Sequence, residues 1–241
     1  MIILGLAGQA GAGKDTVADY LVSNYGFMRF AFSDCLYFEV QQAYNLPNQD
    51  LLRNRDTKDT AQSELALDNC SDSDFAAVAT QVMDDAHRAA NINLYLLPSK
   101  VPLSPRQVLQ WWGTDYRRAQ KPNYWLLKNE EWLWSVHASV PFPEQRPQYF
   151  VNTTVRFENE RQWISRDIEG AWGGNIWHIR RDGIAAVNPH VSEQPLPVLP
   201  GERELYNNDT IERLHTGIDI LMTTNNRIVK VTWQDYNDEV A

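Results

Sequence analysis

Short apolar runs alternate along the chain with longer segments whose apolar residues recur at helical spacing. A run of four to eight apolar residues between polar ones is typical of a buried strand. Such runs predict strands at residues 2–6, 28–32, 149–153, 176–179 and 218–222, with a further candidate at 228–233. The helical spacing predicts helices over residues 15–25, 75–90, 105–118, 124–137 and 159–167.

Strands that alternate with helices indicate an α/β fold with a mainly parallel sheet. Two stretches interrupt the alternation. Residues 53–74 are polar and weakly periodic, and predict an exposed insertion or connection. Residues 188–208 contain four prolines, which exclude a long regular element there. We therefore expect one domain over residues 1–241 that carries these two irregular segments.

The most informative segment is GQAGAGKDT, which begins at Gly8 and joins the first predicted strand to the first predicted helix. It matches the pattern G-x-x-x-x-G-K. The glycines let the backbone turn tightly and bring N–H groups against phosphate oxygens, and the helix N-terminus adds partial positive charge. Lys14 would reach the β- and γ-phosphates as a compact charge. The segment therefore predicts a nucleoside triphosphate site.

The residue after the lysine departs from the usual pattern, in which Ser or Thr places a hydroxyl on Mg²⁺. Here it is Asp15, and Thr16 follows one position later. In one interpretation Asp15 holds the metal directly or through water, while Thr16 contacts the α-phosphate. In the other, Asp15 is an acid that stabilises the first turn of the helix. Both interpretations stay open at this point.

A second polar constellation lies in SPRQVLQWWGTD, which begins at Ser104 and reads as a capped helix with proline in its first turn. Gly113 is expected to end or kink this helix. A guanidinium, a carboxamide and a carboxylate on one face suit a phosphorylated, hydrogen-bonding ligand. An ordinary solvated helix face is the alternative. The polar residues concerned are Arg106, Gln110, Thr114 and Asp115.

The composition of the chain restricts the kinds of partner that it can be expected to bind. The 241 residues include 31 acidic and 22 basic side chains, for a net charge of −9, which disfavours general nucleic-acid binding. No apolar stretch approaches the roughly 18 residues of a membrane span, and the start of the chain does not resemble a signal peptide. Cys35 and Cys70 have no metal-like spacing and suggest thiols in a reducing compartment. We expect a cytoplasmic protein with no membrane partner.

Several segments together resemble the bacteriophage-type deoxynucleoside monophosphate kinases. The likeness extends from the first residues to about Leu214, and the segments occur in the family's order. They are GxxxxGKDT, R-x-x-L-Q-x-x-G-T-D from Arg106, Tyr-Trp at 124–125, V-R-F-x-N-E at 155–160, H-x-S-E at 190–193 and Asn-Asp at 208–209.

This resemblance implies a three-layer P-loop kinase-like fold with helical insertions, and a lid near residues 182–208. It implies Mg²⁺-dependent transfer of the γ-phosphoryl group of ATP to a deoxynucleoside monophosphate, which supplies diphosphate for phage DNA synthesis. Lys14 and Arg156 would be catalytic. ATP would be held by Gly11, Ala12, Gly13, Lys14, Asp15 and Thr16, the last two also serving the metal. The implied substrate-binding residues are Ser33, Arg106, Gln110, Thr114, Asp115, Trp125, Arg156, Glu160, His190 and Glu193.

Two departures from the family keep other functions open. Cys35 and Tyr37 stand where the family often has proline and lysine, and Thr154 stands where it usually has aspartate. A related phage kinase that phosphorylates hydroxymethyluracil in DNA is one alternative, and only there would DNA be a partner. A nucleotide-binding regulator without turnover is another. Under the leading hypothesis the partners are nucleotide substrates, with a homodimer possible, in the host cytoplasm if the chain is phage-encoded.

Overall fold

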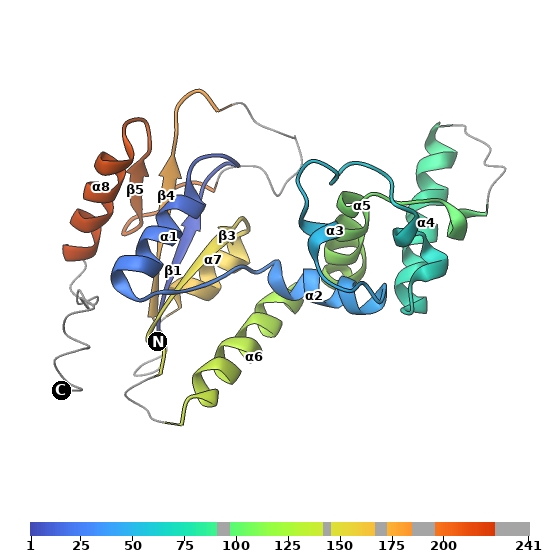
Figure 1. The fold of residues 1–241 in the computed structure, drawn as a ribbon, viewed down its shortest axis with the longest axis horizontal. Helices are drawn as coiled ribbons and strands as arrows, with labels where there is room; N and C mark the ends of the chain where they lie inside the picture. The colour runs from blue at the N-terminus through green and yellow to red at the C-terminus, as the bar shows by residue number, and fades with distance from the viewer. Residues whose placement is uncertain (91–96, 142–145, 167–172, 185–195, 225–241) are drawn as a thin grey trace. The chain divides into compact units, whose positions relative to one another are not determined.

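The chain forms two compact units, seen here in a computed structural model that describes residues 1–90, 97–141, 146–166, 173–184 and 196–224 (Figure 1). Met1–Phe32 and Glu131–Ala241 make up one unit, which we call the sheet unit. Ser33–Glu130 makes up the other, which we call the helical unit. Each unit has a hydrophobic core of its own.

The sheet unit is built on five strands in the order β2-β3-β1-β4-β5, and every neighbouring pair is parallel. Four of the strands were predicted from apolar runs, and the parallel α/β architecture is confirmed. β1 lies in the centre and pairs with β3 on one side and β4 on the other (Figure 1). The strands are β1 (Ile2–Ala7), β2 (Met28–Phe30), β3 (Tyr149–Val155), β4 (Gly173–Arg180) and β5 (Arg203–Tyr206).

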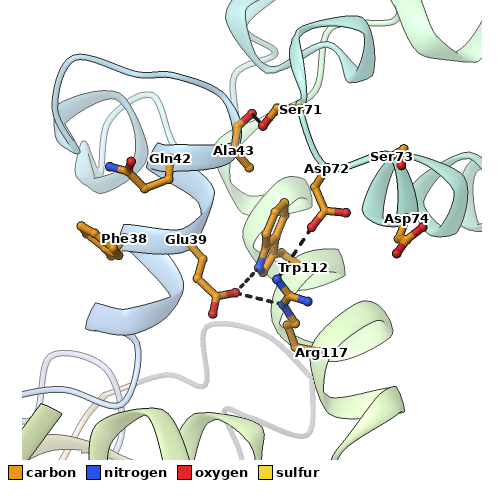
Figure 2. Close-up of a pocket in the computed structure, with 10 residues that line it drawn as sticks. All are labelled: Phe38, Glu39, Gln42, Ala43, Ser71, Asp72, Ser73, Asp74, Trp112 and Arg117. Carbon is orange, nitrogen blue, oxygen red and sulfur yellow. Dashed lines mark hydrogen bonds and ion pairs between the residues drawn. The ribbon is translucent and has the colours of Figure 1, made fainter. Parts of the chain in front are cut away.

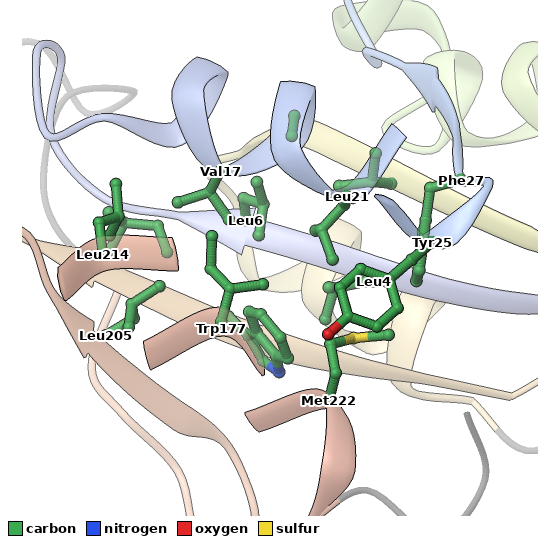
Figure 3. Packing of buried hydrophobic residues seen from close by; sticks show 14 of the residues in the cluster. Leu4, Leu6, Val17, Leu21, Tyr25, Phe27, Trp177, Leu205, Leu214 and Met222 are labelled. Carbon is green, nitrogen blue, oxygen red and sulfur yellow. The ribbon is translucent and has the colours of Figure 1, made fainter. Parts of the chain in front are cut away.

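Helices cover both faces of this sheet. On one face α1 (Lys14–Tyr25) and α8 (Ile211–Thr223) pack on alternate strand residues such as Leu4, Leu6 and Trp177 (Figure 3). On the other face α7 (Glu158–Ser165) comes so close that a Cβ at Gly5 would lie 2.7 Å from Cδ1 of Ile164. Because successive strand residues point to opposite faces, these contacts define three layers.

The predicted strand at 218–222 is wrong, because these residues belong to α8. Leu214, Ile218 and Met222 are buried at intervals of four, which is the spacing of one helix face. Thr210 caps the helix by accepting a hydrogen bond from the backbone of Arg213 at 3.4 Å. Considered alone, this short apolar run is typical of a strand. The helical spacing is visible only when Leu214 and the cap at Thr210 are considered together with it.

The fifth strand lies where the sequence predicted irregular structure. β5 falls inside the proline-containing stretch 188–208 and pairs with β4 from Trp177↔Arg203 to Arg180↔Tyr206. Only Leu205 of this strand is buried, so it carries little of the apolar signal by which strands are recognised. The candidate strand at 228–233 lies outside the described residues.

The helical unit has a core of its own, centred on Phe75, Trp112 and Tyr116. The ring centroids of Phe75 and Trp112 are 4.5 Å apart. The segment 53–74, expected to be exposed, contributes Leu65 and Leu67 to this core, so that expectation is corrected. The elements are α2 (Asp34–Ala43), α3 (Asp50–Arg53), η1 (Ser63–Leu65), η2 (Leu67–Asn69), α4 (Ser73–Ala90), η3 (Pro98–Lys100), α5 (Pro105–Gln110), η4 (Trp111–Arg118) and the first part of α6 (Tyr124–Ser139).

The predicted helix 105–118 is present, but it changes character part-way. Ser104 is the N-cap as expected, with its hydroxyl accepting from the Gln107 backbone at 3.3 Å and the Gln107 side chain accepting in return at 2.9 Å. Gly113 does not end the helix, because α5 continues into the π-helical turns of η4. The Gly113 carbonyl accepts a hydrogen bond from Trp125 Nε1 at 3.1 Å. Across the described ranges, no helix is both long and apolar enough to cross a membrane.

The core of the helical unit should tolerate truncation of one phenylalanine far less than another. Phe75 is fully buried, whereas Phe38 on α2 is 58% exposed. We expect Phe75→Ala to lower the free energy of unfolding by about 3–5 kcal/mol, since the cavity cannot collapse fully. Phe38→Ala is the matched control and should cost below about 0.5 kcal/mol. Urea unfolding followed by tryptophan fluorescence measures both, and equal losses would contradict the assignment of this core.

Candidate functional site

The loop after β1 occupies the carboxyl edge of the parallel sheet. Ala7, the last residue of β1, pairs with Val155 on one side and with His178 on the other. Ligands of open parallel sheets bind beyond this edge, where the loops between strands and helices meet. The glycine loop, which we define as residues 8–13, then leads straight into α1.

Three glycines of the loop have left-handed backbone conformations, with φ of 146° at Gly8, 80° at Gly11 and 100° at Gly13. A Cβ at Gly8 would lie 2.4 Å from the Ile179 backbone carbonyl oxygen, so packing also requires glycine there. A Cβ at Gly13 would lie 2.3 Å from Nδ2 of Asn207, so any other residue would displace that side chain. The backbone conformation favours glycine at both positions.

Lys14 places its charge inside the loop. Its Nζ donates to the carbonyl oxygens of Gly8 and Gln9, at 2.8 and 2.9 Å. The side chain starts from the first residue of α1, so the ammonium and the helix N-terminus concentrate positive charge in the same place. The binding of phosphate by Lys14 stays a prediction from the sequence.

Asp15 lies at the start of α1 and forms an ion pair with Arg29 of β2. Arg29 also reaches Asp19, one turn further along the helix, at 2.8 Å. The Asp15 side chain remains 57% exposed, and Thr16 follows it on the same turn. Magnesium takes one or two protein oxygens and fills its other positions with water and phosphate. A carboxylate and a hydroxyl fit that requirement, although the described residues contain no cluster of three or more metal-ligand side chains.

Arg156 and Glu160 have different roles in the structure. Arg156 is exposed and follows β3 at the same sheet edge as the glycine loop. Glu160 is 2% exposed, and its carboxylate accepts hydrogen bonds from the backbone N–H groups of Arg156 and Phe157 at 2.8 and 3.2 Å. Glu160 therefore stabilises the turn that presents Arg156, and the substrate contact predicted for it is not supported by this geometry.

Thr154 stands where the resembled family usually has aspartate. Its hydroxyl takes part in hydrogen bonding at the end of the sheet. Thr154 Oγ1 accepts a hydrogen bond from the Phe32 backbone at 3.0 Å. The Thr154 backbone in turn donates to Asn152 Oδ1 at 2.9 Å. These bonds hold the end of β3 against the chain that leaves β2.

The other predicted substrate residues belong to the helical unit or lie outside the described ranges. Arg106 is held by a two-pronged ion pair with Asp59, with Nε–Oδ1 at 2.5 Å and Nη2–Oδ2 at 3.1 Å, and the hydrogen bond keeps the pKa of Asp59 below its usual value. Trp125 is 3% exposed and packs in the core, so it does not offer a wall to a ligand. Ser33 precedes α2, Gln110 is half-buried, and Thr114 and Asp115 are exposed on η4. His190 and Glu193 lie outside the described residues.

Sequence reasoning missed a pocket of about 610 Å³ in the helical unit, between α2, the start of α4 and η4 (Figure 2). Glu39 lies at its centre, and one carboxylate oxygen accepts from Trp112 Nε1 at 3.0 Å and from Arg117 Nε at 2.9 Å. Arg117 also lies 3.7 Å from a carboxylate oxygen of Asp72. The helix α2 was not predicted, so nothing in the sequence brought Glu39 to this pocket.

Burial and hydrogen bonding shift the titration of the groups behind this pocket. Burial, and then the hydrogen bond that the hydroxyl donates to Glu39, raise the pKa of Tyr124. Burial and a hydrogen bond to Asp72 raise the pKa of Tyr116. For Arg117 burial works toward a lower pKa, but the hydrogen bond to Glu39 and the nearby charges of Glu39, Tyr124 and Tyr116 together outweigh it, and the pKa is raised. Tyr116, Tyr124 and Arg117 therefore keep their protons to higher pH than they would in the unfolded chain.

The sequence is similar over nearly its whole length to a protein of Acanthamoeba polyphaga mimivirus. The two are 26% identical over 225 residues, which cover 90% of this chain and 94% of the relative. The relative carries the name of a proposed deoxynucleotide monophosphate kinase. No protein-family model matches the sequence.

This chain is a phosphotransferase, a kinase. The full-length similarity and the lysine held inside the glycine loop agree on that point. A solved sugar kinase from Janibacter sp. HTCC2649, crystallised without ligand, aligns with 92% of each chain at 12% identity and a TM-score of 0.38. At that level of similarity it adds nothing to the assignment, which depends on the first relative and on the site itself.

The pocket predicts how the stability of the kinase changes at high pH. The pKa values of Tyr116 and Tyr124 are raised in the folded chain above the ordinary value of 10.0, so their contribution is complete below that pH. Above it the unfolded chain loses protons that the folded chain keeps, and stability falls as pH rises. We expect urea unfolding to show this fall from about pH 10 upward. Tyr124→Phe cannot ionise and should show a shallower fall, and an equally steep one would contradict the prediction.

Proposed function

We propose that the chain transfers the γ-phosphoryl group of ATP to a deoxynucleoside monophosphate and so produces the diphosphate. The observation that carries this proposal is the Lys14 ammonium, held by two carbonyl oxygens within the glycine loop at the N-terminus of α1. The choice of acceptor is supported by the name of the mimivirus relative and by the resemblance of the later segments.

The reaction mainly requires positioning and positive charge. An oxygen of the acceptor phosphate forms a bond to the γ-phosphorus while the bond from that phosphorus to the β–γ bridging oxygen breaks, and ADP leaves. Negative charge spreads over the equatorial oxygens as two anions approach each other. The acceptor phosphate is already ionised at neutral pH, so no side chain is required as a general base.

The sheet unit supplies the residues suited to the donor side. The glycine-loop N–H groups and the N-terminus of α1 would receive the donor phosphates, and Lys14 would bind the β- and γ-phosphate oxygens. Asp15 and Thr16 would hold Mg²⁺, which when bound neutralises charge on those oxygens. Arg29 keeps the Asp15 carboxylate close to the helix start through their ion pair. Arg156 offers a guanidinium at the same sheet edge.

The helical unit supplies the residues that the resemblance assigns to the acceptor. Among them Arg106 has the best-defined geometry, because Asp59 holds two of its guanidinium nitrogens. The ion pair fixes the plane of the guanidinium, and a planar guanidinium suits the geometry of phosphate oxygens. Arg106 is thus the leading candidate for recognition of the acceptor phosphate.

Removal of the Lys14 charge should stop the transfer. We expect Lys14→Ala to lower kcat by about a hundredfold or more, because one charge that stabilises the transition state is lost. Steady-state assays with ATP and a deoxynucleoside monophosphate measure the effect. The exposed Lys121 is the matched control, and Lys121→Ala should retain wild-type turnover. A folded Lys14→Ala protein with near wild-type kcat would overturn the assignment of the loop.

The acceptor can be identified by following label from ATP. We expect phosphate from γ-labelled ATP to appear on at least one of the four deoxynucleoside monophosphates and not on DNA. A net charge of −9 disfavours a polyanion, whereas one phosphate needs only a local cation. Label that appears only on duplex containing hydroxymethyluracil would replace this function with the DNA kinase. ATP binding without transfer to either acceptor would indicate a nucleotide-binding regulator.

A further inference from the structure

Two adjacent asparagines follow β5 and make different contacts. Asn207 Nδ2 donates a hydrogen bond to the carbonyl oxygen of Ala12, in the glycine loop, at 2.9 Å. Asn208 instead pairs with Asp182, accepting from its backbone at 2.8 Å and donating to its carboxylate at 2.7 Å. Within the part of the chain that the structure describes, Asn207 bonds to the glycine loop and Asn208 bonds to Asp182. The chain therefore provides a comparison between two neighbouring residues of the same type.

The backbone of Asn207 is fixed by the sheet. Its N–H donates to the Arg180 carbonyl at 2.7 Å, which continues the pairing of β4 and β5 one residue past the end of β5. Three residues later Thr210 caps α8. Since strand pairing on one side and a helix start on the other hold this turn, the Asn207 side chain reaches the glycine loop from a well-defined position.

The contact with the loop is tight. Ala12 is 1% exposed, so its carbonyl would lack access to water if Asn207 did not bond to it. A buried acceptor without a partner is costly, which gives this hydrogen bond a structural purpose. The Asn207 amide also fills the space beside Gly13, where a Cβ would lie 2.3 Å from Nδ2. Asn207 thus touches both residues that precede Lys14.

The hydrogen bond from Asn207 to the Ala12 carbonyl also fixes the direction of the Gly13 N–H. The Ala12 carbonyl and the Gly13 N–H belong to the same peptide unit, and in a trans peptide they point in opposite directions. Within the described residues no peptide bond is cis. By holding the carbonyl toward itself, Asn207 turns the Gly13 N–H away, leaving that donor available on the other side of the peptide.

We propose that Asn207 is a positioning residue for the donor triphosphate: its amide holds the Ala12–Gly13 peptide so that the Gly13 N–H faces the donor phosphates. The proposal rests on the proposed function, because it takes the glycine loop as the ATP site. Asn207 acts through the loop and does not itself need to contact the nucleotide. Its effect should therefore fall on ATP binding and leave the affinity for the acceptor unchanged.

Two variants and one control test this role. Asn207→Asp keeps the size and shape of the side chain but replaces the N–H donor with an oxygen that repels the Ala12 carbonyl. Asn207→Ala removes both the donor and the packing. Asn208→Ala removes the neighbouring amide, which bonds to Asp182 and not to the loop. Calorimetry with ATP alone, followed by KM for ATP and for the acceptor, provides the readout.

We expect both Asn207 variants to weaken ATP binding about tenfold, as for loss of one well-formed hydrogen bond, with the acceptor KM unchanged. Asn208→Ala should bind ATP like the wild type. If Asn207→Ala fails to fold, Asn207→Asp decides the question because it fills the same space. Wild-type ATP affinity in Asn207→Asp would show that the residue only packs and would overturn the proposal. A wild-type chain that binds no ATP would overturn both this proposal and the proposed function, whereas binding without transfer would overturn only the latter.

Discussion

The central position of β1 is the constraint on which the candidate site depends. β1 is paired in parallel on both sides, so its carboxyl end cannot shift without breaking two ladders of hydrogen bonds. The loop that follows must turn sharply away from the sheet, and Ile179 on the neighbouring strand leaves Gly8 no room for a side chain. The geometry of the glycine loop is therefore set by the sheet as much as by the loop's own residues.

The same sheet edge gathers the other groups around the loop. β3 ends beside β1 and is followed by Arg156. The buried Glu160 stabilises this turn by accepting a hydrogen bond from the Arg156 backbone. β4 and β5 end on the other side, and the turn after β5 brings Asn207 to the loop. Because parallel strands all end at one edge, residues that are far apart in the sequence collect there. Lys14 lies among them as a compact charge.

The helical unit is stabilised by a different set of interactions. Its core combines aliphatic side chains with a cluster of aromatic rings. Its pocket is organised by Glu39, which accepts hydrogen bonds from Trp112, Arg117 and Tyr124. These partners leave the half-buried carboxylate well compensated, which is the condition for keeping a charge away from water. The Arg106–Asp59 pair is more exposed and is only weakly stabilising by itself. Its value lies in the orientation that it gives to the guanidinium.

Local pattern was a reliable guide where an element carries a strong signal. The apolar runs of β1, β2, β3 and β4, the capped start at Ser104 and the glycine loop were all recognisable without the structure. The run at 218–222 misled because five residues cannot separate a strand from one side of a helix. The helix α2 was missed because only Val40 and Ala43 of it are buried, which leaves little periodic signal.

The sequence by itself determined the fold class and the position of the glycine loop with Lys14, since each of these follows from residues close together in the chain. Tertiary structure decided that residues 33–130 form a compact unit and that β5 joins the sheet. It also decided that Trp125 and Glu160 are buried, although the motif resemblance placed both at the substrate. The contact between Asn207 and Ala12 spans 195 positions, and no local pattern encodes it. The burial of a side chain and its contacts with distant residues depend on how the strands pair. The strand pairing is fixed only when the whole sheet has formed.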